Sequence, residues 1–207
     1  MQAKNNFCLL SVFFLPFSLS PIVKHALAGI CVANASHLAA VITLYYLVRE
    51  ISPSAPARKN QLAFTTACLY ILSPAGIFLS APYGESTFAL LNFAGLYCYA
   101  QATQAKFREA RYSDEQEFWW TLAAGVSFGA ASMVRSNGLL SGLLFAWDAL
   151  ATLPHWRKVI NDPEQRTRLL TTLAAGSLLA LAFAVPQVVA YTQYCTGHSP
   201  TLSLIHI

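Results

Sequence analysis

Three ionisable residues stand apart from the other charges of this 207-residue chain: Glu85, Arg135 and Asp148. Each lies inside, or at the edge of, a long stretch that is dominated by apolar residues. Ionisable groups are costly to place at membrane depth, so they are functional candidates by default. Together they could present an acid and a cation to a ligand.

Arg135 begins the sequence Arg-Ser-Asn-Gly at 135–138. A guanidinium can hold a phosphate group with two parallel hydrogen bonds. Ser136 and Asn137 add polar donors, and Gly138 permits close approach of the backbone. The alternative is an interfacial arginine that extends to lipid headgroups. The residues alone leave both roles open.

Glu85 lies in the segment Ser-Ala-Pro-Tyr-Gly-Glu-Ser at 80–86, where a proline and a glycine flank Tyr83. These two helix breakers predict a tight turn that presents an acid and a phenol. The alternative role for Glu85 is an acid that the dipole of the following helix stabilises. Asp148 falls inside a predicted helix, which favours a hydrogen bond between helices or an acid that extends to water.

The elements that must position these residues are hydrophobic helices. Hydrophobic residues make up 56% of the chain and charged residues only 11%, whereas a soluble domain has about 25% charged residues. A helix needs about 20 apolar residues to cross a bilayer. We therefore predict an all-α, polytopic membrane protein, a single transmembrane domain over 1–207. Its expected spans, about six in number, are 26–48, 62–80, 86–105, 118–134, 138–153 and 169–191.

The charge distribution predicts how these spans are oriented. Ten of the 13 basic residues lie in or beside the loops 52–60, 106–117 and 154–168. By the positive-inside rule these loops face the cytosol, so the short turns that hold Glu85 and Arg135 face the opposite side. The apolar stretch 7–19 is more typical of a membrane-embedded segment than of a signal peptide, because Lys24 and His25 interrupt the signal pattern.

Other classes of function fit the residues poorly. The basic residues lie between hydrophobic blocks rather than on one aromatic-rich face, which argues against nucleic-acid binding. The five histidines lack a second ligand at helical spacing and the five cysteines form no CxxC pair, so we expect no metal site. Cys195 is the only cysteine in a predicted loop.

Three segments resemble motifs of one known family. Residues 73–91, SPAGIFLSAPYGESTFALL, resemble the motif SPA…FL.A.YSE..FALL of GPI mannosyltransferase II, the PIG-V family. Residues 134–139, VRSNGL, are similar to its RSNG motif, and 191–195, YTQYC, to its YTQ.C segment. Residues 13–17, FFLPF, match a further segment more loosely. The order and the spacing of the motifs agree with the family.

The resemblance implies a C-type glycosyltransferase of the endoplasmic reticulum membrane. Such an enzyme takes mannose from dolichyl-phosphate mannose and adds the second, α1,6-linked mannose to the glycosylphosphatidylinositol (GPI) precursor on the lumenal side. The lipid-linked donor and the glycolipid acceptor would be its partners, and a small accessory membrane subunit could be a third. The resemblance implies no further cofactor. Arg135 would hold the leaving phosphate, with Tyr83, Glu85, Ser136 and Asn137 as further substrate-binding candidates.

The resemblance also has gaps. The family's enzymes are considerably longer, and their catalytic acid lies in a loop that would precede Phe7. The catalytic residue is therefore unknown, and we expect this chain to be an internal or truncated piece that is inactive alone. Another dolichyl-phosphate-mannose-dependent mannosyltransferase, or a non-enzymatic membrane subunit or transporter, stays open as an alternative. A transporter would show paired interrupted helices in two repeated halves, and the sequence has none.

Overall fold

The computed structural model describes residues 21–53, 55–73, 83–107 and 114–195, and within these ranges it is helical without a strand. The all-α class predicted from the sequence is thus confirmed. The chain divides into two compact units, residues 1–104 and 105–207, each held by its own internal contacts.

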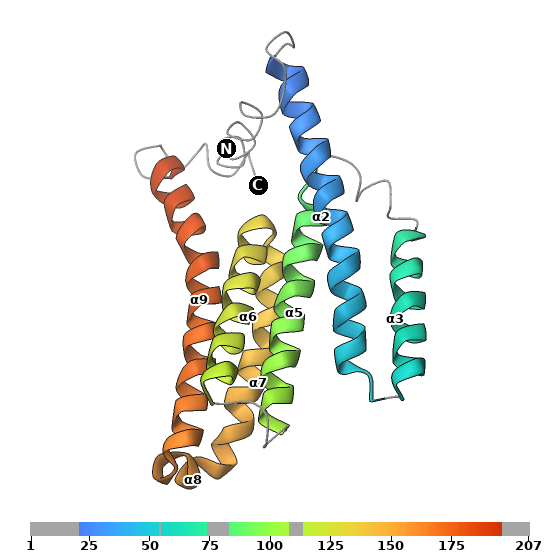
Figure 1. The fold of residues 1–207 in the computed structure, drawn as a ribbon. Coiled ribbons are helices and arrows are strands. Elements are labelled where there is room, and N and C mark those ends of the chain that lie inside the picture. The colour runs from blue at the N-terminus through green and yellow to red at the C-terminus, as the bar shows by residue number, and fades with distance from the viewer. Residues whose placement is uncertain (1–20, 54, 74–82, 108–113, 196–207) are drawn as a thin grey trace. The chain divides into compact units, whose positions relative to one another are not determined.

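The first unit contains α2 (Pro21–Ile51), α3 (Pro56–Ile71) and most of α5 (Glu85–Phe107). Helices α2 and α3 run side by side and are joined by a short connection (Figure 1). Helix α3 begins with a proline, which is favourable at the first helical position because its missing N–H would have no partner there. Side chains tie α5 to α2: Ser36 Oγ lies 3.3 Å from Thr87 Oγ1, and Gln104 donates to the carbonyl of Glu50.

The second unit is a set of packed helices whose longest member is α9 (Figure 1). Its elements are α6 (Asp114–Val134), the 3-10 helix η1 (Ser136–Ser141), α7 (Gly142–Thr152), the 3-10 helix η2 (Leu153–His155), α8 (Trp156–Asn161) and α9 (Pro163–Tyr194). Asp162 caps α9, because its side chain accepts a hydrogen bond from the Glu164 N–H at 3.1 Å.

Small residues let α6 and α9 approach closely. A Cβ added to Gly125 would lie 2.8 Å from the Ala175 Cα, and one added to Gly129 would lie 3.1 Å from the Ala182 Cβ. These two glycines form a GxxxG pattern, which is common where membrane helices pack backbone to backbone. On the α7 side, the buried rings of Phe128 and Phe145 meet edge to face at 5.9 Å between centroids.

The described helices overlap the predicted spans but have other boundaries. Each predicted span overlaps a described helix, yet the charged segments 56–60, 114–117 and 163–168, assigned to loops, continue α3, α6 and α9. The predicted span 138–153 is not one α-helix: it is split among η1, the 11-residue α7 and η2. Residues 74–80 of the predicted span 62–80 and the segment 7–19 lie outside the described residues.

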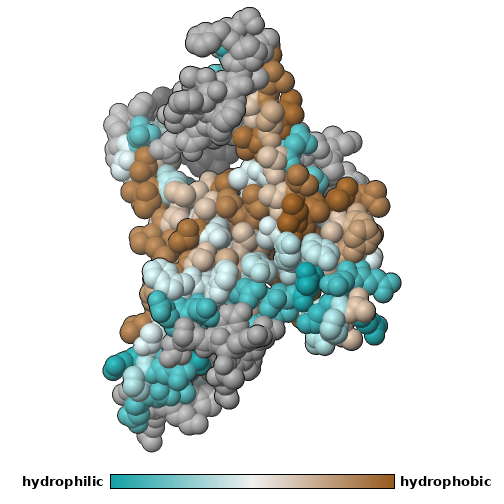
Figure 2. All heavy atoms as spheres, in the orientation of Figure 1, coloured by the Kyte–Doolittle hydropathy of each residue, from teal (hydrophilic) through white to brown (hydrophobic). Residues whose placement is uncertain are grey.

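Among the described helices, α2 and α9 are long and apolar enough to cross a membrane. The most apolar stretch of α9 is only 11% buried, so its side chains face outward. An outward apolar surface is expected of a helix in lipid, where burying such residues brings little gain. Figure 2 shows hydrophilic residues gathered in the first unit where α2 ends and α3 begins, and in the second unit around α8.

Candidate functional site

Arg135, Ser136 and Asn137 form an exposed polar turn between α6 and η1. The Arg135 backbone is extended, with φ −145° and ψ 135°, which ends α6 and redirects the chain. The turn is closed at both sides, because the Arg135 N–H donates to the Ala131 carbonyl and the Gly138 N–H donates to the Arg135 carbonyl, each at 2.9 Å. The three side chains predicted as a binding group are therefore presented together at the surface.

Gly138 is the buried end of this turn. A Cβ added here would lie 2.5 Å from the Ser132 N and 2.7 Å from the Ser132 Cα. Such a separation is too short for any side chain, so the turn requires glycine at this position. The sequence predicted that Gly138 permits a close backbone approach; in the structure that approach is made to α6. It fixes the position from which Arg135 projects.

Tyr83 and Glu85 lie at the start of α5, in the first unit. The Gly84 carbonyl accepts the first helical hydrogen bond, from the Phe88 N–H at 2.8 Å. Tyr83 is 64% exposed, Glu85 is half-buried in the first turn, and the next residue, Ser86, is fully buried. This position suits the predicted dipole-stabilised acid and equally an acid offered to a ligand.

The structure brings the predicted site residues together as two groups. Arg135, Ser136 and Asn137 share one turn of the second unit, and Tyr83 and Glu85 share the start of α5 in the first unit. Residues 74–82 of the motif at 73–91 lie outside the described residues.

Two further residues singled out in the sequence have defined positions. Asp148 is half-buried near the middle of α7, inside a helix as expected. Cys195 is the exposed residue that ends α9, and its N–H donates to the Tyr191 carbonyl at 2.8 Å. Residues 191–194 of the motif form the last turn of α9, and Cys195 lies in the turn that follows the helix, outside it as predicted.

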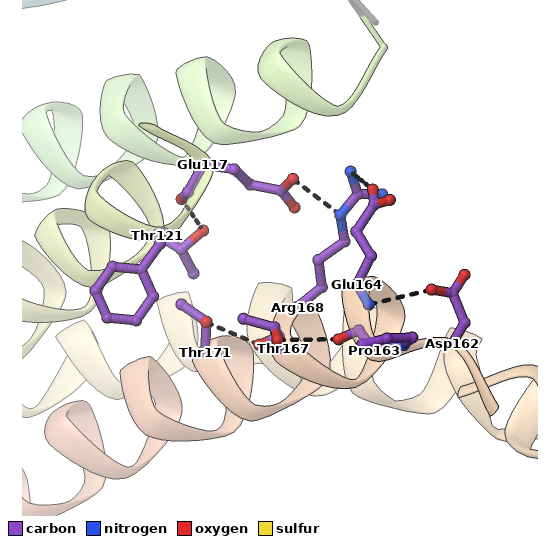
Figure 3. A pocket seen from close by; sticks show the side chains of 9 residues that line it. Glu117, Thr121, Asp162, Pro163, Glu164, Thr167, Arg168 and Thr171 are labelled. Carbon is purple, nitrogen blue, oxygen red and sulfur yellow. Dashed lines mark hydrogen bonds and ion pairs between the residues drawn. The ribbon is translucent and has the colours of Figure 1, made fainter. Parts of the chain in front are cut away.

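A polar cavity of about 530 Å³ lies between the start of α6 and the start of α9 (Figure 3). The Arg168 side chain crosses it: Nη2 lies 2.7 Å from Glu164 Oε1, and Nε lies 3.0 Å from Glu117 Oε2. The Nε contact is an ion pair without hydrogen-bond alignment. The pair with Glu164 lies within α9 and involves a half-exposed carboxylate, so it contributes little to stability. The pair with the more buried Glu117 links the start of α9 to the start of α6.

The hydroxyl groups of this cavity are already engaged. Thr121, Thr167 and Thr171 each donate to a backbone carbonyl one turn earlier in their own helix, at 2.9, 3.0 and 2.9 Å. Carboxylates outnumber cations on the wall, which disfavours an anionic ligand. Within the described ranges no group of three His, Cys, Asp or Glu side chains could hold a metal ion. The cavity is therefore best explained as a helix junction.

One pair of polar side chains could not be recognised as neighbours from the sequence. His37 of α2 and Tyr70 of α3 stack with 5.3 Å between ring centroids, and Phe93 of α5 meets Tyr70 edge to face at 5.6 Å. The His37 Nδ1 and the Tyr70 Oη are both buried, and neither has a hydrogen-bond partner among the described residues. The spacing of these residues in the sequence gave no signal, because each comes from a different helix.

Comparison with known proteins covers nearly the whole chain. The model of the family described as Mannosyltransferase (PIG-V) matches residues 7–202. A GPI mannosyltransferase 2 of Aspergillus fumigatus is 42% identical over 164 residues, which are 79% of this chain and 36% of the relative. A GPI mannosyltransferase 2 of Chaetomium globosum is 39% identical over 179 residues, which are 86% of this chain and 37% of the relative.

A more distant relative has the same type of name. The GPI alpha-1,6-mannosyltransferase 2 of Cricetulus griseus is 32% identical over 150 residues, which are 70% of this chain and 27% of that protein. The chain thus spans little more than a third of the length of the fungal relatives that it matches. No solved structure matches the chain.

Proposed function

The chain belongs to the PIG-V mannosyltransferase family, and on that basis we propose that it is part of the enzyme that transfers the second, α1,6-linked mannose to the GPI precursor. The match of the family over residues 7–202 carries this proposal, since it includes every described helix. The donor is dolichyl-phosphate mannose, and the acceptor is the glycolipid precursor that already has one mannose.

The exposed turn at Arg135 is the part of the site that we assign to the donor. In the displacement, a hydroxyl oxygen of the acceptor attacks the anomeric carbon of the donor mannose, and dolichyl phosphate leaves. The leaving phosphate gains negative charge, which a guanidinium stabilises with paired hydrogen bonds. Ser136 and Asn137, exposed on the same turn, add neutral donors. The base that accepts the hydroxyl proton is not assigned to this chain.

Tyr83 and Glu85 are assigned to the acceptor. Their position at the start of α5 combines a half-buried carboxylate with a largely exposed phenol. Both groups can hydrogen-bond sugar hydroxyls. The protein is a multi-pass membrane protein of the endoplasmic reticulum, with six spans of which α2 and α9 are the clearest. Both turns face the lumen, and a small accessory membrane subunit is a further partner.

An exchange of segments tests this function. Residues 7–202 replace the matched segment of the Aspergillus fumigatus relative, and the chimera is expressed in cells that lack their own enzyme for the second mannose. We expect the one-mannose GPI precursor to disappear and GPI-anchored protein to return to the cell surface. The unaltered relative and an empty vector set the two limits of the scale.

The outcome discriminates among the open alternatives. A chimera that reaches the membrane in normal amount but leaves the one-mannose precursor in place would refute the assigned acceptor. If another mannosylated lipid appears instead, the chain belongs to a transferase with a different acceptor. If the chimera consumes no dolichyl-phosphate mannose, the alternative of a non-enzymatic membrane protein gains support.

A further inference from the structure

A second cavity, of about 560 Å³, lies within the first compact unit. It opens where α2 ends and α3 begins, with one wall from α5. Helix α2 contributes Tyr46, Arg49 and Glu50, α3 contributes Lys59 and Asn60, and α5 contributes Tyr97. Its volume falls in the range of about 300–1,000 Å³ that is common for small-ligand sites. None of its lining residues belongs to the two turns assigned to mannose transfer.

Cations outnumber carboxylates among the residues that line this cavity. Arg49 and Lys59 come from different helices, and Glu50 is the single carboxylate among the lining residues. Neither cation forms an ion pair with a residue in the part of the chain that the structure describes. Lys59 is nevertheless half-buried, and a partly desolvated ammonium that forms no ion pair with a described residue is unfavourable. An anion in the cavity would remove this cost.

Aromatic side chains hold Arg49 in place. Its guanidinium carbon lies 5.7 Å from the centroid of the Tyr45 ring and 5.9 Å from that of the Tyr46 ring. Cation–π contacts of this length restrict the side chain without using its N–H donors. The donors are therefore available to a phosphate group, which Arg binds in bidentate geometry.

The start of α3 adds to the positive potential. Ala55 provides no side-chain cap, and the first turn contains Arg58 and Lys59 but no acidic residue. Cations are unfavourable at this end of a helix, where the backbone dipole is already positive. The hydrophilic surface at this junction, seen in Figure 2, adjoins the apolar length of α2. Arg, Lys and Tyr at such a boundary lie at the level of lipid headgroups.

We propose that this cavity binds the phosphate of an anionic membrane lipid, with Arg49 and Lys59 contacting its oxygens and Tyr46 and Tyr97 flanking the headgroup. The site is independent of the mannose transfer proposed above. It would anchor the α2–α3 junction to one leaflet and make the stability of the first unit depend on lipid composition.

Native mass spectrometry of the purified chain in detergent tests the proposal. Phosphatidylinositol and phosphatidylcholine with the same acyl chains are titrated separately. We expect Arg49→Ala and Lys59→Ala each to weaken phosphatidylinositol binding about tenfold, the size of one charge-assisted contact. Arg58→Ala is the matched control, because it removes the same charge from the same turn but does not line the cavity. It should change binding less than twofold.

Three results would overturn the proposal. Equal losses for Arg58→Ala and Lys59→Ala would indicate diffuse charge rather than a site. Equal binding of the two lipids by the unaltered chain would remove the need for an anion. Displacement of phosphatidylinositol by millimolar inorganic phosphate would mean that the cavity takes free phosphate instead of a lipid. The unfolding midpoint of each variant, together with Lys59→Gln, separates lost binding from lost folding.

Discussion

Arg135 and Gly138 belong to the same turn but have different roles in it. Arg135 is exposed and projects from the turn, whereas Gly138 is buried against the backbone of α6. From the sequence, both residues are expected to be features of a ligand site. In the structure, Gly138 permits the close contact with α6 that the turn requires, and Arg135 is exposed on the surface of that turn.

Replacement of Arg135 in the segment-exchange chimera tests its role in donor binding. Arg135→Lys keeps the charge but loses the bidentate geometry, so it should restore transfer only in part. Arg135→Ala should lower the rate on the order of 10²-fold, as is typical when a group that stabilises developing charge is removed. The measurement is transfer at low and at saturating donor, with protein amounts matched by immunoblot. Full activity of the lysine variant would instead indicate a headgroup anchor.

Replacement of Gly138 should affect folding rather than chemistry. Gly138→Ala places a Cβ against the backbone of Ser132, so we expect a loss of about 1–3 kcal/mol in unfolding free energy, as for other overpacked sites. Gly176→Ala is the matched control, because its added Cβ has its nearest neighbour, the Phe145 Cβ, at an ordinary 3.7 Å. Both variants are compared by unfolding in mixed detergents. If the two unfold alike, the tight contact does not limit stability.

At the scale of elements, the pair α6 and α9 supports the Arg135 turn. Gly125, Gly129 and the fully buried Ala175 let the two backbones approach, and Leu179 of α9 packs against Gly142 at the start of α7. In a membrane, close packing of small residues replaces the hydrophobic driving force that joins helices in water. The turn at the end of α6 is therefore held by contacts along the whole helix.

Adding one carbon to a residue of α6 tests which face of this helix packs against α9. Gly125→Ala brings a Cβ to 2.8 Å from the Ala175 Cα, so the helices must separate and stability should fall by about 1–3 kcal/mol. Val126→Leu adds one carbon at the next residue, which is 59% exposed, and should change stability by less than about 0.5 kcal/mol. Thermal unfolding of both variants in the same detergent provides the comparison. If Val126→Leu lowered stability more than Gly125→Ala, the face of α6 that contains Gly125 would not be the face that packs against α9.

The positions of the helices could be predicted from the sequence, and their ends could not. Long uncharged runs mark the apolar parts, but a helix continues into water where its first turn is charged and capped, as at Asp162 and Glu164. The predicted span 138–153 differs from the structure for another reason. Gly138 and Gly142 allow close contacts with α6 and α9, and η1 and α7 take the place of one regular helix there. These contacts depend on the partner helix, which periodicity does not reveal.

The same limit applies to the sites. The exposed group at 135–137 could be read from one short segment, because neighbours in sequence remain neighbours in a turn. The two cavities and the stacked pair of His37 and Tyr70 join residues from different helices. They could be found only once the helices were packed.

At the scale of the whole molecule, the distribution of charge predicts which side of the membrane each loop faces. The segments 52–60, 106–117 and 154–168 hold or border ten of the 13 basic residues, so they should face the cytosol. A cysteine introduced at position 112 in a cysteine-free chain should therefore react with an impermeant reagent applied from the cytosol. A cysteine at position 136 should react only after the lumen is opened. Labelling of position 112 from the lumen alone would invert the topology.

The central claim is that this segment takes part in transfer of mannose from dolichyl phosphate to the GPI precursor. Its most direct test is the reaction itself, in microsomes that contain the segment-exchange chimera, with radiolabelled dolichyl-phosphate mannose and the one-mannose precursor. We expect a two-mannose product from which an α1,6-specific mannosidase releases the label, and loss of this product with Arg135→Ala. A properly inserted chimera that forms no labelled product, or forms one with another linkage, would contradict it.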